Sequence, residues 1–146
     1  MKKVFFLTLL VFILTACDAT HGIDYRVGIY TIEWNYNEQS VYEDEQLIVS
    51  SVDDLDLYVS NHDRFHFSLD AYDETFFENQ QILIITKYVF NQTDFKINEF
   101  SIIDGFAYIT CVYTLTADVE MSQKSIWIIV KDEEKITDFV FDLYHV

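Results

Sequence analysis

Two histidines four positions apart have the residue type and spacing that most resemble a metal or catalytic site in this chain. They are His62 and His66, in the run Asn61-His62-Asp63-Arg64-Phe65-His66. On a helix this spacing would put both imidazoles on one face, as many zinc sites require. Imidazole also gains and loses a proton near neutral pH. His62, His66 and His145 are therefore the candidate general bases if the protein is an enzyme.

A solvated loop is the other interpretation of this segment, and we prefer it. Arg64 and Phe65 interrupt the histidines, and the sequence specifies no third ligand. The chain also has no glycine-rich phosphate loop, no Gly-x-Ser-x-Gly elbow, no His-Glu-x-x-His and no Cys-x-x-Cys. We therefore predict a non-catalytic protein without a metal or a cofactor, and keep histidine-based catalysis as the alternative.

Four acidic runs are the next candidates, because carboxylate oxygens hold divalent cations. None has the Asp-x-Asp-x-Asp-Gly spacing that wraps one calcium ion. We expect solvated faces and turns, with an ion site at Asp70, Asp73 and Glu74 as the alternative. The runs are Glu43–Glu45, Asp53–Asp56, Asp70–Glu74 and Asp132–Glu134.

A cysteine and two tryptophans complete the candidates. Cys111 lies in the run Phe106–Leu115, on a face of alternating apolar residues, so we expect a buried and inert thiol. Trp127 lies inside an aliphatic run and is expected in the core. Trp34 is the better candidate for a surface platform that stacks on a sugar.

The elements that must position these residues are mostly strands. Runs rich in β-branched and aromatic residues predict strands, and a run that is apolar on both faces indicates a central one. Asp104-Gly105 joins two such runs and supplies the positive φ angles of a tight hairpin. The predicted strands are Tyr25–Tyr36, Gln46–Ser50, Ile82–Phe90 (central), Phe95–Ile103, Phe106–Leu115, Ile126–Val130 and Ile136–Tyr144.

Two short helices interrupt the strands. Ser51–Val59 has a capping serine, acids in its first turn and apolar residues on one face. Tyr72–Glu78 is expected to form one helical turn that places Phe76 and Phe77 in the core. The predicted fold class is α+β: an antiparallel-rich sheet of about seven strands, as a sandwich or an open barrel, with one or two short helices.

The N-terminus has the order of a secretory signal. Met1-Lys2-Lys3 is positive, the apolar run Val4–Leu14 is too short to span a bilayer, and Leu14-Thr15-Ala16-Cys17 follows. This succession resembles the signal peptide and lipobox of bacterial lipoproteins. The resemblance implies that residues 1–16 are cleaved and that Cys17 is diacylated, which gives a stable membrane anchor. An uncleaved anchor helix and an ordinary cleaved signal are the alternatives.

The rest of the chain reads as a tether and one domain. Residues 17–24 are the lipidated cysteine and a polar tether, and residues 25–146 form a single acidic α+β domain. The chain has no proline. Hydrophobic residues make up 51% of it and aromatic residues 17%, which indicates a folded core. One domain of this size needs no disulfide.

Charge narrows the range of partners. The 146 residues carry 9 basic and 25 acidic side chains, and removal of residues 1–16 takes away two lysines and no acid. The mature formal charge is then −18, which repels nucleic acid and anionic lipid headgroups. Cationic partners are favoured electrostatically.

A second resemblance concerns the domain itself. Ser51-x-x-Asp54-Leu55-x-x-Tyr58 is followed by Tyr72-Asp73-Glu74-x-Phe76-Phe77 and an aliphatic strand. This succession, over roughly residues 47–132, is similar to small uncharacterised secreted domains of low-GC Gram-positive bacteria and their relatives. The resemblance implies a packing pattern and carries no established activity.

These observations together predict a lipid-anchored lipoprotein on the outer face of the cell membrane. We expect its domain to be a non-catalytic binding or interaction module, with an envelope protein as the partner and no nucleic acid. The alternatives are an envelope enzyme with His62, His66 or His145 as its base, and a structural or spacer lipoprotein without a ligand.

Overall fold

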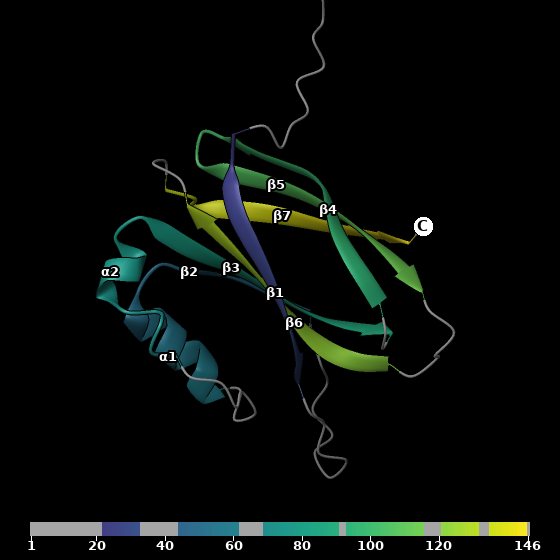
Figure 1. Ribbon diagram of the computed structural model, residues 1–146, viewed down its shortest axis with the longest axis horizontal. Helices are drawn as coiled ribbons and strands as arrows, with labels where there is room; N and C mark the ends of the chain where they lie inside the picture. The colour runs from purple at the N-terminus through teal and green to yellow at the C-terminus, as the bar shows by residue number, and fades with distance from the viewer. Residues whose placement is uncertain are drawn as a thin grey trace, which may run out of the picture.

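Three stacked layers make up the described part of the chain: a three-stranded sheet, a four-stranded sheet and two helices (Figure 1). The computed structural model describes residues 22–32, 44–61, 69–90, 93–115, 121–131 and 135–145. The strands are β1 (Asp24–Ile32), β2 (Glu45–Val49), β3 (Gln80–Phe90), β4 (Thr93–Ile103), β5 (Phe106–Leu115), β6 (Met121–Lys131) and β7 (Asp138–His145), and the helices are α1 (Val52–Asn61) and α2 (Glu74–Phe77). The predicted α+β class is confirmed, in the form of a sandwich.

The four-stranded sheet has the order β1-β6-β3-β2, and every neighbouring pair in it is antiparallel. β3 and β6 take the two central places because they are apolar on both faces. Their residues 82–85 and 126–130 are all buried. The prediction of a central strand from Ile82 is confirmed. The predicted first strand, Tyr25–Tyr36, corresponds to β1 as far as Ile32, and its remainder lies outside the described residues.

The three-stranded sheet has the order β4-β5-β7. β4 and β5 form the predicted hairpin, with Asp104 at φ 52° and Gly105 at φ 77° in its two-residue turn. A Cβ on Gly105 would lie 3.1 Å from the Lys135 carbonyl oxygen, so glycine serves both the turn and the close approach of the segment before β7. β7 runs parallel to β5, an arrangement that the sequence pattern did not indicate.

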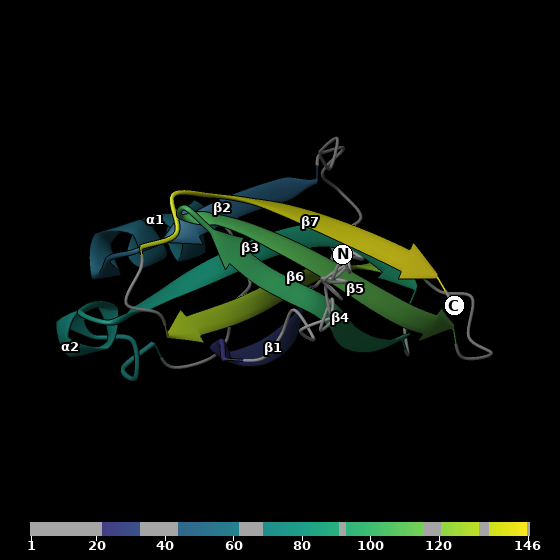
Figure 2. The ribbon, with the colours of Figure 1, turned by 90° about the horizontal axis from the view of Figure 1, so that it is seen from above.

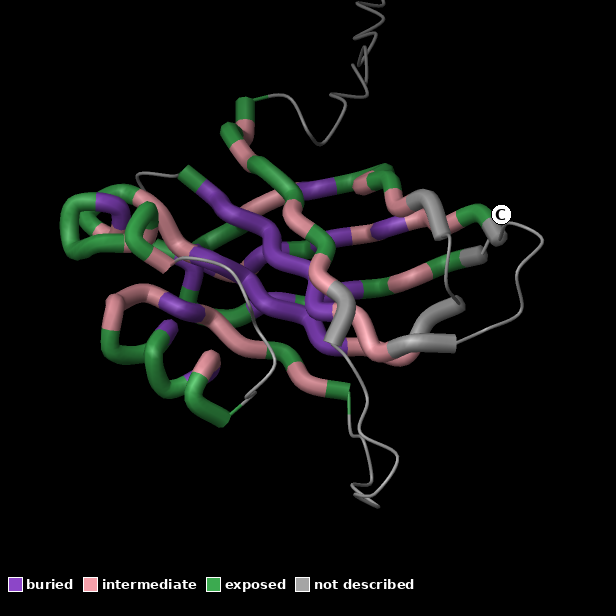
Figure 3. The backbone as a smooth tube through the Cα atoms, turned by 60° about the horizontal axis from the view of Figure 1, so that its bottom comes forward, coloured by how far each residue is buried: buried purple, intermediate pink, exposed green. Residues whose placement is uncertain are grey.

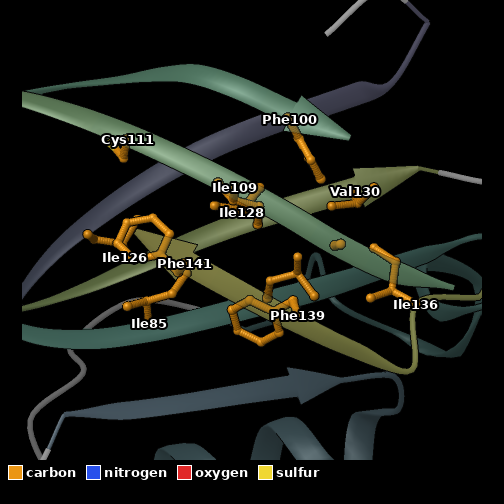
Figure 4. Close-up of a cluster of buried hydrophobic side chains, with 12 residues drawn as sticks. Ile85, Phe100, Ile109, Cys111, Ile126, Ile128, Val130, Ile136, Phe139 and Phe141 are labelled. Carbon is orange, nitrogen blue, oxygen red and sulfur yellow. The ribbon is translucent and has the colours of Figure 1, made fainter. Parts of the chain in front are cut away.

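The main core lies between the two sheets (Figure 4). Alternate residues of β3 and β6 meet alternate residues of β4, β5 and β7 there, as the period of two requires. The buried members are Leu83, Ile85, Phe100, Ala107, Ile109, Cys111, Ile126, Ile128, Val130, Ile136, Phe139 and Phe141.

A second core fixes the helices on the other face of the four-stranded sheet. Ser51 Oγ accepts a hydrogen bond from the Asp54 N–H (3.1 Å) and starts α1, which buries Leu55 and Tyr58. α2 buries Phe76, while Phe77 is half-buried. Figure 3 shows burial concentrated along the middle strands and exposure along α1. Neither helix in the described part of the chain is long and apolar enough to cross a membrane.

Candidate functional site

The residues predicted to carry chemistry are mostly not placed by the structure. Cys17, Trp34, His62 and His66 lie outside the described residues. His145 is the last residue of β7, where its backbone pairs with Tyr113 of β5. The roles predicted for these residues therefore stay predictions.

Several of the acidic residues have structural contacts. Asp73 Oδ1 accepts a hydrogen bond from the Phe76 N–H (2.9 Å) and caps α2. Asp54 Oδ2 accepts one from the Ser50 N–H (3.4 Å), and Asp44 Oδ2 lies 3.4 Å from Lys87 Nζ. No cluster of three metal-ligating side chains occurs among the residues that the structure describes. Glu43 and the run Asp132–Glu134 lie outside those residues.

Cys111 and Trp127 are both in the core, as predicted. The Cys111 side chain is 2% exposed, and burial raises the pKa of its thiol to about 11. At neutral pH the thiol is protonated, which makes it a poor nucleophile. Trp127 is fully buried against α1 and α2. Neither residue is available to a ligand.

A buried network of hydroxyl groups joins α1 to the four-stranded sheet. The Tyr58 hydroxyl lies 3.0 Å from Thr86 Oγ1 and 2.9 Å from Ser125 Oγ, and Trp127 Nε1–H donates to Ser125 Oγ (2.8 Å). Burial raises the pKa of Tyr58, so its hydroxyl stays neutral at physiological pH. The network therefore fixes the orientation of α1 on the sheet. Its residues come from distant segments, so no local sequence signal could have found it.

Tyr72 extends this polar and aromatic cluster toward the surface. Its ring lies edge-on to those of Phe76 (5.0 Å between centroids) and Trp127 (5.8 Å). Burial, with the neighbouring Tyr30 hydroxyl as a further cause, raises the pKa of Tyr72 to about 12. At physiological pH the hydroxyl of Tyr72 is therefore neutral, like that of Tyr58.

Two adjoining hollows lie where α1 begins, beside α2 and the start of β3. The larger has a volume of about 320 Å³. Both are bordered by Ser50, Phe77 and Glu78. Gln81 supports the second, because its amide donates to Ser50 Oγ (2.8 Å) and to the Ile136 carbonyl (3.0 Å) and accepts from the Ile136 N–H (2.7 Å). These bonds form a clamp that joins the start of β3 to Ser50 and Ile136. Its signal in the sequence was a glutamine at the start of an aliphatic strand, and the sequence analysis did not predict it.

The outer face of the three-stranded sheet is the most distinctive surface of the molecule. Figure 2 looks onto β4, β5 and β7, and neither α1 nor α2 covers them. Large apolar side chains point outward there: Tyr108 is 48% exposed, Val140 42% and Tyr144 54%. The Phe106 and Tyr108 rings lie 4.8 Å apart on the same face. We call this surface the β5–β7 face.

Acidic side chains lie among these apolar ones. Asp138 and Asp142 are exposed and alternate with Val140 and Tyr144 along β7, and Glu99 of β4 pairs with Thr110 of β5. Lys96 of β4, opposite Val112 of β5, adds one exposed basic group to this face. Acids remain in excess, so the face is suited to a partner with apolar and basic groups. The sequence shows that acids and apolar residues alternate at every second position of β7. It does not show which face of which sheet the helices cover.

No family model, curated protein or solved structure matches the chain.

Proposed function

We propose that this chain is a lipid-anchored lipoprotein on the outer face of the cell membrane, and that its domain is a non-catalytic module that binds a cationic envelope protein. The anchor is inferred from the positive, apolar and small-residue order that ends at Cys17. The binding role is inferred from the β5–β7 face, which is the single observation that carries it.

The character of the β5–β7 face supports a protein as the partner. Tyr108, Val140 and Tyr144 offer apolar area on a flat sheet, which suits another protein surface better than a small ligand. Asp138 and Asp142 add negative charge in a chain whose formal charge is −16, so nucleic acid would be repelled. A surface with lysines or arginines among apolar residues would be complementary in both respects.

The contrast between the two outer faces gives the second line of support. The four-stranded sheet buries its outer face under α1 and α2, with Trp127 at the centre. The three-stranded sheet leaves Tyr108, Val140 and Tyr144 to solvent. Apolar groups of this size on one open face are typical of interaction surfaces.

Site-specific photo-cross-linking in intact cells tests the proposal. A photoreactive residue at position 108 is expected to give a discrete adduct with a basic envelope protein, and one at Leu57, exposed on α1, is expected to give none. Asp142→Lys should abolish the adduct at position 108, because it reverses a charge on the face. Equal adducts from both positions, or none from position 108, would favour a spacer without a specific partner.

A further inference from the structure

The outer edge of β7 offers backbone hydrogen-bonding groups as well as side chains. β7 is the last strand of its sheet, and among the described residues only β5 pairs with it. Its register with β5 runs without a shift from Asp138, opposite Phe106, to His145, opposite Tyr113. An edge strand of this kind carries a row of N–H and C=O groups that can pair with an added strand.

The side chains along this edge follow a strict alternation. Phe139 and Phe141 point into the core, and Asp138, Val140, Asp142 and Tyr144 are exposed on the opposite face. An added strand would place its own outward side chains directly beside these four. Acid and apolar groups alternate among them, so the outward residues of the complementary strand are basic and apolar by turns, which is a repeat of four along its sequence.

The other edges of the two sheets are less suited to such pairing. β2 has only five residues. β4 has a register shift between Ile97 and Glu99, and a bulge of this kind disturbs the row of backbone groups. β1 carries both Asp24 and Arg26, so its exposed charges cancel and do not favour a basic strand. β7 is the edge that combines length, regularity and negative charge.

A second copy of this chain is a poor occupant of the same edge. Two β7 strands side by side would bring Asp138 and Asp142 of both copies into one row of like charges. Each chain also has a formal charge of −16, so association of two copies is opposed over the whole molecule. Charge complementarity therefore selects a cationic partner.

We propose that β7 binds an extended segment of a cationic protein by strand addition, and that the segment carries lysine or arginine at every fourth position, with an apolar residue midway between them. Its basic side chains would lie beside Asp138 and Asp142, and its apolar ones beside Val140 and Tyr144. This inference rests on the proposed binding function and specifies how the partner is held. Backbone pairing supplies affinity, and the four-residue spacing of the basic side chains supplies specificity.

A synthetic peptide is the probe for the first test. It is capped, has eight residues to match β7, and repeats Lys-Thr-Val-Thr, so that lysine and valine alternate on one face and threonine fills the other. Its binding to the full chain in detergent is measured by fluorescence anisotropy. A control with the same composition in the order Lys-Thr-Lys-Thr-Val-Thr-Val-Thr is expected to bind at least tenfold more weakly, because its two lysines cannot lie beside Asp138 and Asp142 at the same time. Equal affinities for the two peptides would overturn strand addition and leave only nonspecific charge attraction.

Backbone methylation separates strand pairing from side-chain docking. A strand paired along one edge uses every second N–H group. The Lys-Thr-Val-Thr peptide is therefore made in two forms, N-methylated at the lysines and valines or at the threonines, and one form is expected to bind while the other does not. Binding of both forms would contradict the proposal. Hydrogen exchange of the complex should show new protection in β7.

Protein variants distinguish failure of this inference from failure of the proposed function. Asp138→Asn with Asp142→Asn should weaken peptide binding severalfold, while Asp56→Asn, an exposed acid on α1, should have no effect. Asp138 Oδ1 accepts a hydrogen bond from the Phe139 N–H (2.8 Å), and asparagine at position 138 keeps an oxygen that can accept the same bond. If the peptide fails but the cellular adduct from position 108 persists, the face binds a partner without strand addition. Loss of both would reject the binding function as well.

Discussion

The hydroxyl oxygens of Tyr58 on α1 and Ser125 on β6 lie 2.9 Å apart, although the two residues are 67 positions apart in the sequence. Ser125 is also bonded to the Trp127 indole, and Tyr58 to Thr86 on the neighbouring strand. All of these groups are buried. The position of α1 along the sheet is therefore set by directional bonds, in addition to apolar contact.

Tyr58→Phe should destabilise the domain by about 1–3 kcal/mol. The substitution removes one hydroxyl and leaves Thr86 and Ser125 short of a partner in a buried site. Urea unfolding monitored by tryptophan fluorescence measures the effect. Tyr108→Phe is the matched control, because its side chain is 48% exposed, and it should change the free energy of unfolding by less than about 0.5 kcal/mol. Equal effects of the two variants would contradict a structural role for the network.

Local signals in the sequence predicted most of the elements but not how they are assembled. Asp104-Gly105 predicts its hairpin because a two-residue turn with positive φ needs these residue types. Ile82–Ile85 predicts a central strand because both faces are apolar. The hydroxyl network, the clamp at Gln81 and the parallel pairing of β7 depend on contacts between distant segments. A pattern of period two cannot show which strand lies beside which.

The candidate surface could be predicted only in part for the same reason. Val140 and Tyr144 alternate with acids in the sequence, which indicates a strand with one apolar face and one mixed face. The mixed face is left uncovered by α1 and α2 because both helices pack on the other sheet. Which sheet the helices cover depends on the packing of α1 and α2 against Trp127. Such contacts between distant segments do not show in a local sequence pattern.

Gly105→Val should destabilise the domain by more than about 1 kcal/mol. A β-branched residue resists the φ of 77°, and its Cβ would press on the Lys135 carbonyl oxygen at 3.1 Å. Thermal unfolding measures the change. Asp104→Asn is the control and should be nearly neutral, because asparagine also adopts positive φ. An unchanged melting temperature for Gly105→Val would show that the turn tolerates a side chain.

Alkaline pH should weaken the fold through Cys111. Burial raises the pKa of this thiol from an ordinary value of 9.0 to about 11, so between these values the folded state keeps a proton that the unfolded state has lost. Stability is then full below pH 9 and falls, by about 2 kcal/mol, as the pH rises to 11. Urea unfolding at several pH values measures the slope. Cys111→Val should flatten it between pH 9 and 10, whereas above pH 10 the raised pKa values of Tyr58 and Tyr72 lower stability in both proteins. An unchanged slope between pH 9 and 10 would mean that the thiol does not titrate in this range.

Cys17→Ser should block lipid labelling and release or misprocess the protein. The residue precedes the folded domain, so circular dichroism of the purified variant should match that of the parent. Metabolic labelling with a fatty acid, followed by cell fractionation, tests the anchor. Cys111→Ala is the control and should still be labelled, because its thiol is buried. Labelling that persists in Cys17→Ser would contradict the lipobox interpretation.

Salt should stabilise the domain by screening its own charge. With 25 acidic and 9 basic residues, repulsion acts over about 30 Å at 0.01 M salt and only about 8 Å at 0.15 M. The melting temperature should therefore rise over this range of sodium chloride. Calcium or magnesium at millimolar concentration should act in the same way without saturating, since Asp73 is occupied as the cap of α2. Isothermal titration calorimetry that gives one calcium site of micromolar affinity would contradict diffuse screening and would favour an ion site at Asp70, Asp73 and Glu74.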